Sequence, residues 1–312
     1  MDPNTSSLRI KRAVWAALVG NGIIALMKFI IAIFTNSSAL LAEGFHSVAD
    51  TGNQAFLLLG FKLSARPPDS GHPFGYGKER YFWPFIVAIS MFTIGAVLSI
   101  NEGISKILNP QPLKNAGLGY LILGLSVLFE SYPLYLAFQA LKKTIKKRGI
   151  IRALRESKTP SIFIVLFEDS AAIFGISIAF FGIFAASLTR NSIYDGVASI
   201  LIGVTLAIVA LFLSYETKSL LIGEGVSDED FDTIKKVIVT VPEVSEVIDI
   251  LTMHLGPEDI LVNLNINFVD NLTTDEVEEA IDKVERAIQE ELPTVKRIFV
   301  EAESIRRVPK RR

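Results

Sequence analysis

Cysteine is absent from this chain of 312 residues, and histidine occurs only three times. Without thiols the chain has no disulfide framework, no zinc finger with Cys ligands, no thiolate nucleophile and no iron site held through sulfur. Three imidazoles also provide poorly for a catalytic zinc that is held by several histidines. Any metal ion must therefore be bound by histidine, carboxylate or other oxygen ligands.

Charged residues are few as well, at 21% of the chain, whereas hydrophobic residues make up 50% and the mean hydropathy is +0.42. These values are typical of membrane proteins and argue against a protein that lies wholly outside the membrane. The charges are divided unevenly. Residues 1–225 carry 20 Lys and Arg against 13 Asp and Glu, and residues 226–312 carry 11 against 20. An acidic C-terminal part argues against nucleic acid as a partner.

Six apolar stretches in the first 225 residues are each long enough to cross a bilayer. They lie near residues 13–34, 38–61, 82–105, 118–141, 161–187 and 194–215. Lys and Arg are concentrated before the first stretch and after the second and fourth, whereas the alternate connections hold only Lys106, Lys114 and Arg190. By the positive-inside rule, both termini are predicted to be cytoplasmic.

The last 87 residues have the pattern of a small water-soluble domain. Residues 226–241 and 273–292 have helical spacing, the second with Thr273 and Glu276 as a capping box, and residues 244–255, 260–269 and 295–302 have strand patterns. The order αββαβ predicts a ferredoxin-like α+β domain. We therefore expect a six-span membrane domain over residues 1–225, a cytosolic domain over 226–306 and a basic tail over 307–312.

Several ionisable residues lie at membrane depth, where each charge costs about 2.5–3.5 kcal/mol on insertion scales. Glu43, His46 and Asp50 lie on one stripe of the second span, and the last two are roughly 12–18 Å from its beginning. The fifth span carries Glu168 and Asp169 at a comparable depth. The remaining candidates are Lys28 in the first span and Glu130 in the fourth.

Two interpretations compete for these residues. Lys28 and Glu43 are each expected to hold helices together by hydrogen bonds and ion pairs, Lys28 with a carboxylate for example. In contrast, His46, Asp50 and Asp169 are ligand-type side chains at one depth on two helices, which is the arrangement a divalent ion needs. Glu168 ranks below Asp169 because neighbouring residues on a helix point about 100° apart.

The motifs H-S-V-A-D from His46 to Asp50, D-S-G-H-P-F-G-Y-G-K-E-R-Y-F-W from Asp69 and F-E-D-S-A-A from Phe167 are present together. With them, nearly the whole chain resembles the cation diffusion facilitator family, in its zinc-transporter branch. The resemblance implies a homodimeric exporter that exchanges a divalent cation for protons. It also implies a tetrahedral site made by two residues on span two and two on span five.

The resemblance carries over to His46, Asp50 and Asp169, but Val165 occupies the position of the family's other ligand on span five. The fourth ligand remains open among Glu168, Glu130 and water. The variant resembles the branch that includes the mitochondrial zinc-transporter-like members of animals.

Two further sites follow from the resemblance. Asp69 and His72 match part of a loop metal site of some bacterial members, with Tyr76 at the third position, and form a candidate second site. In the C-terminal domain, the positions where relatives place metal-binding His and Asp are occupied by Ile248, Asn265, Glu301 and Glu303. A binuclear metal cluster is therefore not expected, and we expect this domain to fold without zinc. Glu301 and Glu303, together with His254, are left as candidates for a weakly held ion.

Lys78 offers a contact of another kind. It is predicted to pair with an acidic residue such as Glu224 and so to couple transmembrane and cytosolic movements; a solvated surface lysine is the alternative.

These observations predict a proton-coupled exporter of divalent metal, with zinc favoured and manganese, iron or cobalt as alternatives, and with no organic cofactor. The ligands bind metal when deprotonated, and the imidazole, with an ordinary pKa near 6.5, suits a proton-driven release. Homodimers in contact with membrane lipid are expected, in a bacterial inner membrane or an organelle membrane. The rival hypothesis is a membrane metal sensor or scaffold that binds cations without transporting them, and a third is a transporter of another small cation.

Overall fold

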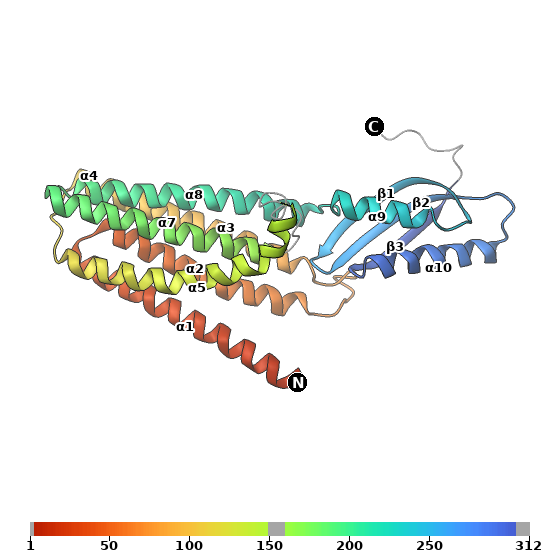
Figure 1. The fold of residues 1–312 in the computed structure, drawn as a ribbon, viewed down its shortest axis with the longest axis horizontal. Coiled ribbons are helices and arrows are strands. Elements are labelled where there is room, and N and C mark those ends of the chain that lie inside the picture. The colour runs from red at the N-terminus through yellow and green to blue at the C-terminus, as the bar shows by residue number, and fades with distance from the viewer. Residues whose placement is uncertain (1–2, 149–159, 304–312) are drawn as a thin grey trace. The chain divides into compact units, whose positions relative to one another are not determined.

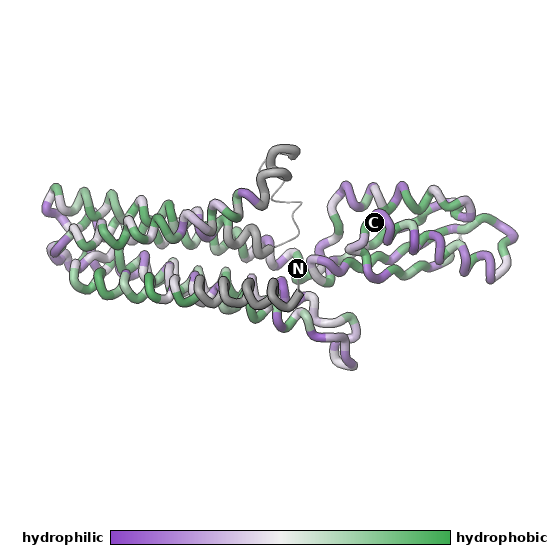
Figure 2. The backbone as a smooth tube through the Cα atoms, turned by 60° about the horizontal axis from the view of Figure 1, so that its bottom comes forward, coloured by the Kyte–Doolittle hydropathy of each residue, from purple (hydrophilic) through white to green (hydrophobic). Residues whose placement is uncertain are grey.

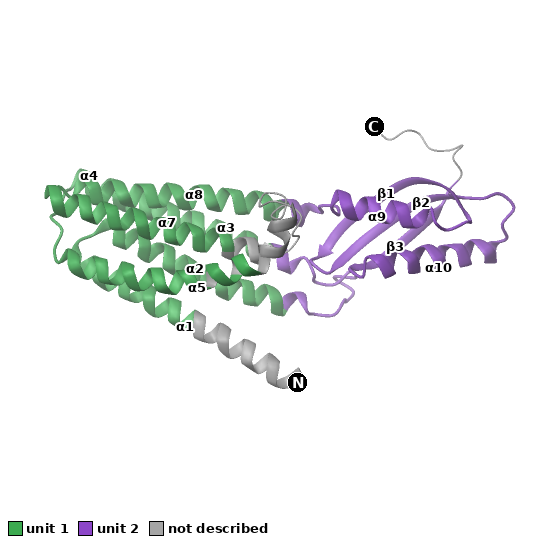
Figure 3. Cartoon of the chain, in the orientation of Figure 1, with its two compact units in different colours: residues 1–62, 82–218 green, residues 63–81, 219–312 purple. Residues whose placement is uncertain are grey.

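The computed structural model describes residues 3–148 and 160–303. The chain separates into two compact units, one of residues 1–62 and 82–218 and one of residues 63–81 and 219–312 (Figure 3). The predicted basic tail, 307–312, lies outside the described residues.

The first unit is a bundle of long helices (Figure 1). Its elements are α1 (Pro3–Thr35), α2 (Ser38–Ser64), α3 (Glu79–Ser90), the π-helix η1 (Met91–Val97), α4 (Leu98–Leu108), α5 (Ala116–Arg148), α7 (Pro160–Thr189) and α8 (Ile193–Ile222). Since α3, η1 and α4 follow one another without a break, the bundle has six helical segments, at the positions of the six predicted stretches. Over the residues that the structure describes, five of them are long and apolar enough to cross a membrane. The sixth, α2, has 27 residues and carries the polar stripe.

Many large apolar residues are exposed along these helices, whose backbone is mostly coloured hydrophobic in Figure 2. Ile33, Leu188 and Ile208 are 71%, 73% and 64% exposed. Exposed apolar side chains at this density are unfavourable in water and match a lipid environment. The protein is therefore a multi-pass helical membrane protein, as predicted.

Two glycines bring α4 and α8 into backbone contact. A Cβ on Gly103 would lie 2.5 Å from the carbonyl oxygen of Gly196, and one on Gly196 would lie 2.9 Å from that of Gly103. Small residues at helix interfaces allow this approach in membranes, where van der Waals packing contributes much of the association. The pair fixes α4 against α8.

Asp195 of α8 holds the beginning of α2. Its carboxylate, which is fully buried, accepts hydrogen bonds from the hydroxyl groups of Ser37 (2.6 Å) and Ser38 (2.9 Å) and from the backbone N–H groups of Ser38 (2.7 Å) and Ala39 (3.4 Å). An acid at a helix N-terminus satisfies N–H groups that have no partner within the helix and interacts favourably with the helix dipole. Here the acid comes from a helix far away in the sequence.

The second unit contains a three-stranded sheet with α9 (Asp228–Ile238) and α10 (Thr274–Glu291). The strands are β1 (Val244–Gly256), β2 (Asp259–Phe268) and β3 (Val295–Ala302), in the order β1-β2-β3, with β1 antiparallel and β3 parallel to β2. Ile260, Val262, Leu264 and Ile266 alternate along β2 and are buried in one core with side chains of both helices. This is the predicted αββαβ domain.

The segment 63–81 between α2 and α3 also belongs to this unit. The Arg297 guanidinium donates to the carbonyl oxygen of Phe74 at 3.2 Å. A Cβ on Gly77 would lie 2.5 Å from the carbonyl oxygen of Leu255, so glycine permits a close backbone approach there. Contacts with the strands therefore hold the loop that connects two spans.

Candidate metal centre

His46 and Asp50 lie one turn apart on the buried side of α2. Only 1% of His46 and 7% of Asp50 is exposed, and His46 Nδ1 is 3.3 Å from Asp50 Oδ1. Neither ring nitrogen has a hydrogen-bond partner in the described part of the chain. Because buried polar atoms are nearly always satisfied, an imidazole without such a partner calls for an explanation, and a bound ion would supply one.

Glu168 of α7 lies beside Asp50. Its carboxyl group, 6% exposed as a residue, is in hydrogen-bonding contact with Asp50 and accepts a hydrogen bond from the side-chain amide of Asn53. Two carboxyl groups in contact cannot both remain charged without a proton or a cation between them. The arrangement therefore favours cation binding between α2 and α7.

Sequence reasoning missed Asn53, which is fully buried. The available signal was its spacing. Asn53 follows Asp50 by three residues and so continues the stripe of His46 and Asp50 along α2. Its amide orients Glu168, and its carbonyl oxygen has no hydrogen-bond partner among the described residues.

The other predicted ligands are placed less closely. Asp169 is half-buried and its Oδ2 atom has no hydrogen-bond partner among the described residues. Glu130 of α5 is buried and close enough to Asp50 and Glu168 to interact with them electrostatically. In the described residues, no three His, Asp or Glu side chains converge as a preformed metal site. The Val165 side chain lies outside the described residues.

A buried ion pair lies one turn from His46. Lys28 Nζ of α1 donates to Glu43 Oε2 at 3.0 Å and to Ser47 Oγ at 2.8 Å, and both charged residues are fully buried. A Cβ on Gly175 of α7 would lie 2.4 Å from Glu43 Oε1. The prediction that Lys28 and Glu43 join helices is confirmed. Because Gly175 has no side chain, the Glu43 carboxylate can lie against the backbone of α7.

The loop candidate is a small hydrogen-bonded cluster. The Tyr76 hydroxyl donates to Asp69 Oδ2 at 2.7 Å, and His72 Nδ1 is 3.6 Å from Asp69 Oδ1. The hydrogen bond from Tyr76, with others from the backbone N–H groups of His72 and Gly71, holds the pKa of Asp69 below its usual range. The cluster brings Asp69 and His72 together. The Tyr76 hydroxyl uses one oxygen of the Asp69 carboxylate as its hydrogen-bond acceptor.

Lys78 belongs to the second unit, as Glu224 does. Its ammonium group lies 3.4 Å from the carbonyl oxygen of Leu221 and 3.9 Å from Met253 Sδ. The backbone carbonyl of Glu224 accepts from His254 N. The pairing of Lys78 with Glu224 stays a prediction.

In the C-terminal domain, the Asn265 side chain donates to Glu303. Glu301 is exposed and His254 is buried. The weakly held ion predicted there stays untested.

Comparison with known proteins bears on the whole chain. The family description "Cation efflux transmembrane domain" matches residues 14–222, and "Cation efflux protein, cytoplasmic domain" matches residues 226–305. The chain belongs to the cation efflux, or cation diffusion facilitator, family. The predicted family and its zinc-transporter branch are thus confirmed.

Named relatives of this cation efflux protein include the mouse "Proton-coupled zinc antiporter SLC30A9, mitochondrial", 31% identical over 265 residues, which cover 84% of this chain and 47% of the relative. "Metal tolerance protein C4" of Arabidopsis thaliana is 34% identical over 260 residues, or 83% of this chain and 57% of the relative. The chain thus spans about half the length of these relatives. "Cation-efflux pump FieF" of Escherichia fergusonii is 25% identical over 285 residues, 91% of this chain and 89% of the relative.

Among solved structures, a nickel form of the MamM C-terminal domain is similar to part of this chain. The match covers 25% of this chain and 98% of the MamM chain, with 23% sequence identity and a TM-score of 0.24.

Proposed function

We propose that this cation efflux protein exports a divalent metal ion, zinc in the first place, in exchange for protons. The observation that carries the proposal is the contact between Asp50 and Glu168 beside a buried His46 without a hydrogen-bond partner among the described residues. One imidazole and two carboxylates on two transmembrane helices suit zinc, and manganese, iron or cobalt would accept the same oxygen-rich set. The zinc antiporter named among the relatives supports zinc.

The proposed chemistry is ligand exchange. An ion arriving from the cytosol loses part of its water shell to His46 and to the carboxylates of Asp50 and Glu168, with the Asn53 amide holding Glu168 in place. These ligands bind metal only when they are deprotonated. Protons that arrive from the other side compete with the ion for the same atoms and release it. Asp169 and Glu130 remain proposed ligands of lower rank.

The site lies between two helices, which supports alternating access. Movement of α7 relative to α2 would separate Glu168 from Asp50 and so change the affinity for the ion. We further propose a homodimer in contact with membrane lipid, with both termini in the cytosol, because a match to the family's cytoplasmic domain covers residues 226–305.

Flux measured in liposomes tests the proposal. Purified protein is reconstituted, zinc is applied with an opposing proton gradient, and zinc and proton movements are recorded together. Asp50→Asn keeps the size of the side chain but removes an anionic ligand. We expect its zinc flux to fall at least about tenfold, the scale expected when a metal site is disturbed. Glu258→Gln, which removes an exposed carboxylate from the β1–β2 turn, is the matched control.

The possible outcomes separate the rival functions. Zinc flux accompanied by proton counterflow supports the exporter, and competition among zinc, manganese, cobalt and iron ranks the metals. Zinc binding without any flux in the unaltered protein would favour the sensor or scaffold. Normal flux in Asp50→Asn would remove the proposed site.

A further inference from the structure

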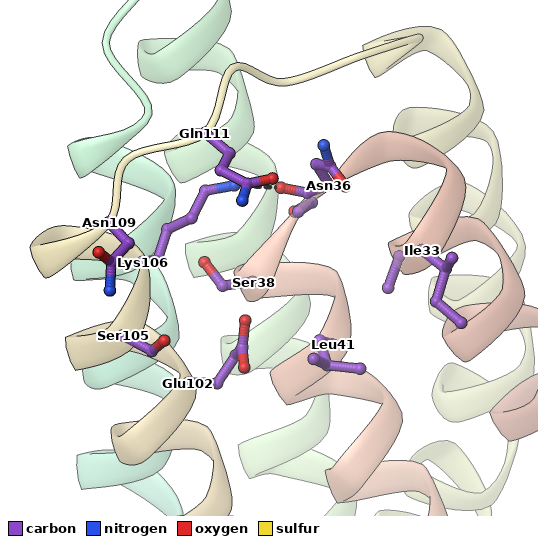
Figure 4. Close-up of a pocket in the computed structure, with 11 residues that line it drawn as sticks. Ile33, Asn36, Ser38, Leu41, Glu102, Ser105, Lys106, Asn109 and Gln111 are labelled. Atoms are coloured by element: carbon purple, nitrogen blue, oxygen red, sulfur yellow. Dashed lines mark hydrogen bonds between the residues drawn. The ribbon is translucent and has the colours of Figure 1, made fainter.

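A polar pocket of about 300 Å³ opens at the end of the bundle that holds the α1–α2 turn and the α4–α5 connection. Figure 4 shows α1 and α2 on one side and α4 on the other. The polar lining comes from Asn36, Ser37, Ser38, Glu102, Ser105, Lys106, Asn109 and Gln111. His46 lies eight residues along α2 from Ser38, about 12 Å at the rise of an α-helix, so the pocket is separate from the candidate metal centre.

Two opposite charges in this pocket, Glu102 and Lys106, interact electrostatically but form no ion pair with each other. Glu102 and Lys106 are four residues apart on α4, a spacing at which Glu and Lys normally interact across one turn. Lys106 instead reaches across the pocket and donates to the carbonyl oxygen of Asn36 (Figure 4). In the described part of the chain, Glu102 forms no hydrogen bond or ion pair, and Lys106 Nζ has no hydrogen bond other than that to Asn36.

The pocket therefore presents hydrogen-bonding groups of both signs, and the Lys106 ammonium group also interacts electrostatically with the buried Asp195 carboxylate. An ammonium group has three N–H donors, so two of those on Lys106 remain for another partner, although only 7% of this residue is exposed. The half-buried Glu102 carboxylate can accept from a cationic donor. A metal ion is disfavoured by the nearby ammonium group and a simple anion by the carboxylate, because like charges repel. A zwitterion satisfies both groups.

The surroundings distinguish a lipid from a soluble zwitterion. The pocket lies where α1 and α4 end and α2 begins, which is the level of the lipid headgroups for helices that cross a bilayer. Ile33, whose side chain is 71% exposed, and Leu41 form an apolar wall beside the charges. A small soluble zwitterion has no long apolar part that could pack against these side chains, whereas the acyl chain of a lipid can lie along them.

From this combination we propose that the pocket binds the headgroup of an aminophospholipid, a lipid with a phosphate and a primary ammonium group. The phosphate accepts from Lys106, the ammonium group donates to Glu102, and an acyl chain follows Ile33. The bound headgroup connects α4 with the α1–α2 turn. The proposal does not depend on which ion the protein exports.

The test is lipid retention by the purified full chain, measured by native mass spectrometry in detergent. Phosphatidylethanolamine, phosphatidylglycerol and the water-soluble headgroup glycerophosphoethanolamine are offered separately and in competition. We expect one phosphatidylethanolamine per chain to be retained in preference to phosphatidylglycerol. Glu102→Gln should weaken this binding about tenfold, which is the effect of losing one charge-assisted hydrogen bond.

Lys114→Gln is the matched control, because it removes an exposed charge from the same connection outside the pocket lining. Its phosphatidylethanolamine retention should equal that of the unaltered chain. Unchanged melting temperatures confirm that the variants are folded. If Glu102→Gln does not fold, Glu102→Asp withdraws the carboxylate by one methylene and should also weaken retention.

Three outcomes would overturn the proposal. Equal retention of phosphatidylglycerol would show that the ammonium group is not recognised. Full competition by the soluble headgroup at equal concentration would indicate a free zwitterion as the occupant. Retention that does not change in the Glu102 variant would place the lipid elsewhere.

Discussion

Glu168 and Asp169, which are neighbours on α7, differ in their contacts. Glu168 meets Asp50 and Asn53, whereas Asp169 is half-buried, and neighbours on a helix point about 100° apart. We therefore expect Glu168→Gln to reduce zinc flux at least about tenfold, on the scale of a disturbed metal site. Asp169→Asn, assayed in the same liposomes, tests the residue that the sequence ranks first. A loss confined to Asp169→Asn would place the metal ligand at that position instead.

Replacement of Lys28 should expose the dependence of Glu43 on its partner. Lys28→Met leaves a buried carboxylate without its ion pair, and breaking one side of a buried pair costs about 3–5 kcal/mol. The double variant Lys28→Met with Glu43→Gln removes both charges and should recover much of the loss. Melting in detergent measures both variants. If the double variant were less stable than Lys28→Met alone, the two buried charges would not be compensating each other.

The sequence placed His46 and Asp50 on one face of the second span by their spacing alone, and the structure shows them one turn apart and buried. Their role as metal ligands stays a prediction. Sequence reasoning ranked Glu168 below Asp169 because the two cannot point the same way on a helix. Which of them faces α2 depends on the rotation of α7 about its axis, and contacts between distant helices set that rotation. Asn53 was missed for the same reason. An amide on a buried stripe becomes informative only when Glu168 is seen beside it.

At the level of helices, the contact between α4 and α8 should be sensitive to a single methyl group. Gly103→Ala directs a Cβ at a backbone oxygen 2.5 Å away, which cannot move as a side chain can. We expect the yield of folded protein in detergent to fall and its melting temperature to drop by several degrees. Gly124→Ala on α5 is the control, since its Cβ would meet nothing within 4 Å. Equal behaviour of the two variants would argue against this contact.

The N-terminus of α10 provides a pH-dependent contribution to the stability of the C-terminal domain. Thr273 donates to Glu276 from its backbone N–H at 2.7 Å and its hydroxyl at 2.8 Å, and these bonds lower the pKa of Glu276. A lowered pKa in the folded state means that the contribution is complete above the unfolded pKa, near 4.3, and disappears as the pH falls through the folded value.

Urea unfolding of residues 226–303 checks this sign. The unaltered domain should be more stable than Glu276→Gln at pH 7, and the difference should shrink when the pH falls below about 4. Thr273→Ala should cost about 1 kcal/mol at pH 7 through loss of the helix cap. A difference between the unaltered domain and Glu276→Gln that grows towards acid pH would contradict the assignment.

Elements were predicted more completely than their contacts. Hydrophobic spacing located the six helical segments and the αββαβ order because both depend on local periodicity. The place of residues 63–81 in the C-terminal unit was not predicted. It depends on Gly77 meeting the backbone of Leu255 and on Arg297 meeting Phe74, which are contacts between distant parts of the sequence.

For the whole molecule, the even number of spans predicts both ends on one side of the membrane. The chain has no cysteine of its own, so Lys114→Cys and Lys146→Cys each introduce a single label site. We expect an impermeant maleimide to reach position 114 only from outside and position 146 only from the cytosol. Labelling of both positions from the same side would refute the six-span arrangement.

The Asp195 carboxylate also determines how the bundle can be deformed. Its four hydrogen bonds tie the first turn of α2 to α8, and the glycine contact ties α8 to α4. At this end the three helices α2, α4 and α8 are therefore held together. His46 and Asp50 lie further along α2, whereas Glu168 lies on α7. If His46, Asp50 and Glu168 are the ligands we propose, any rotation of α2 about Ser38 would change their separation, so contacts at this end of the bundle would influence how tightly an ion is held.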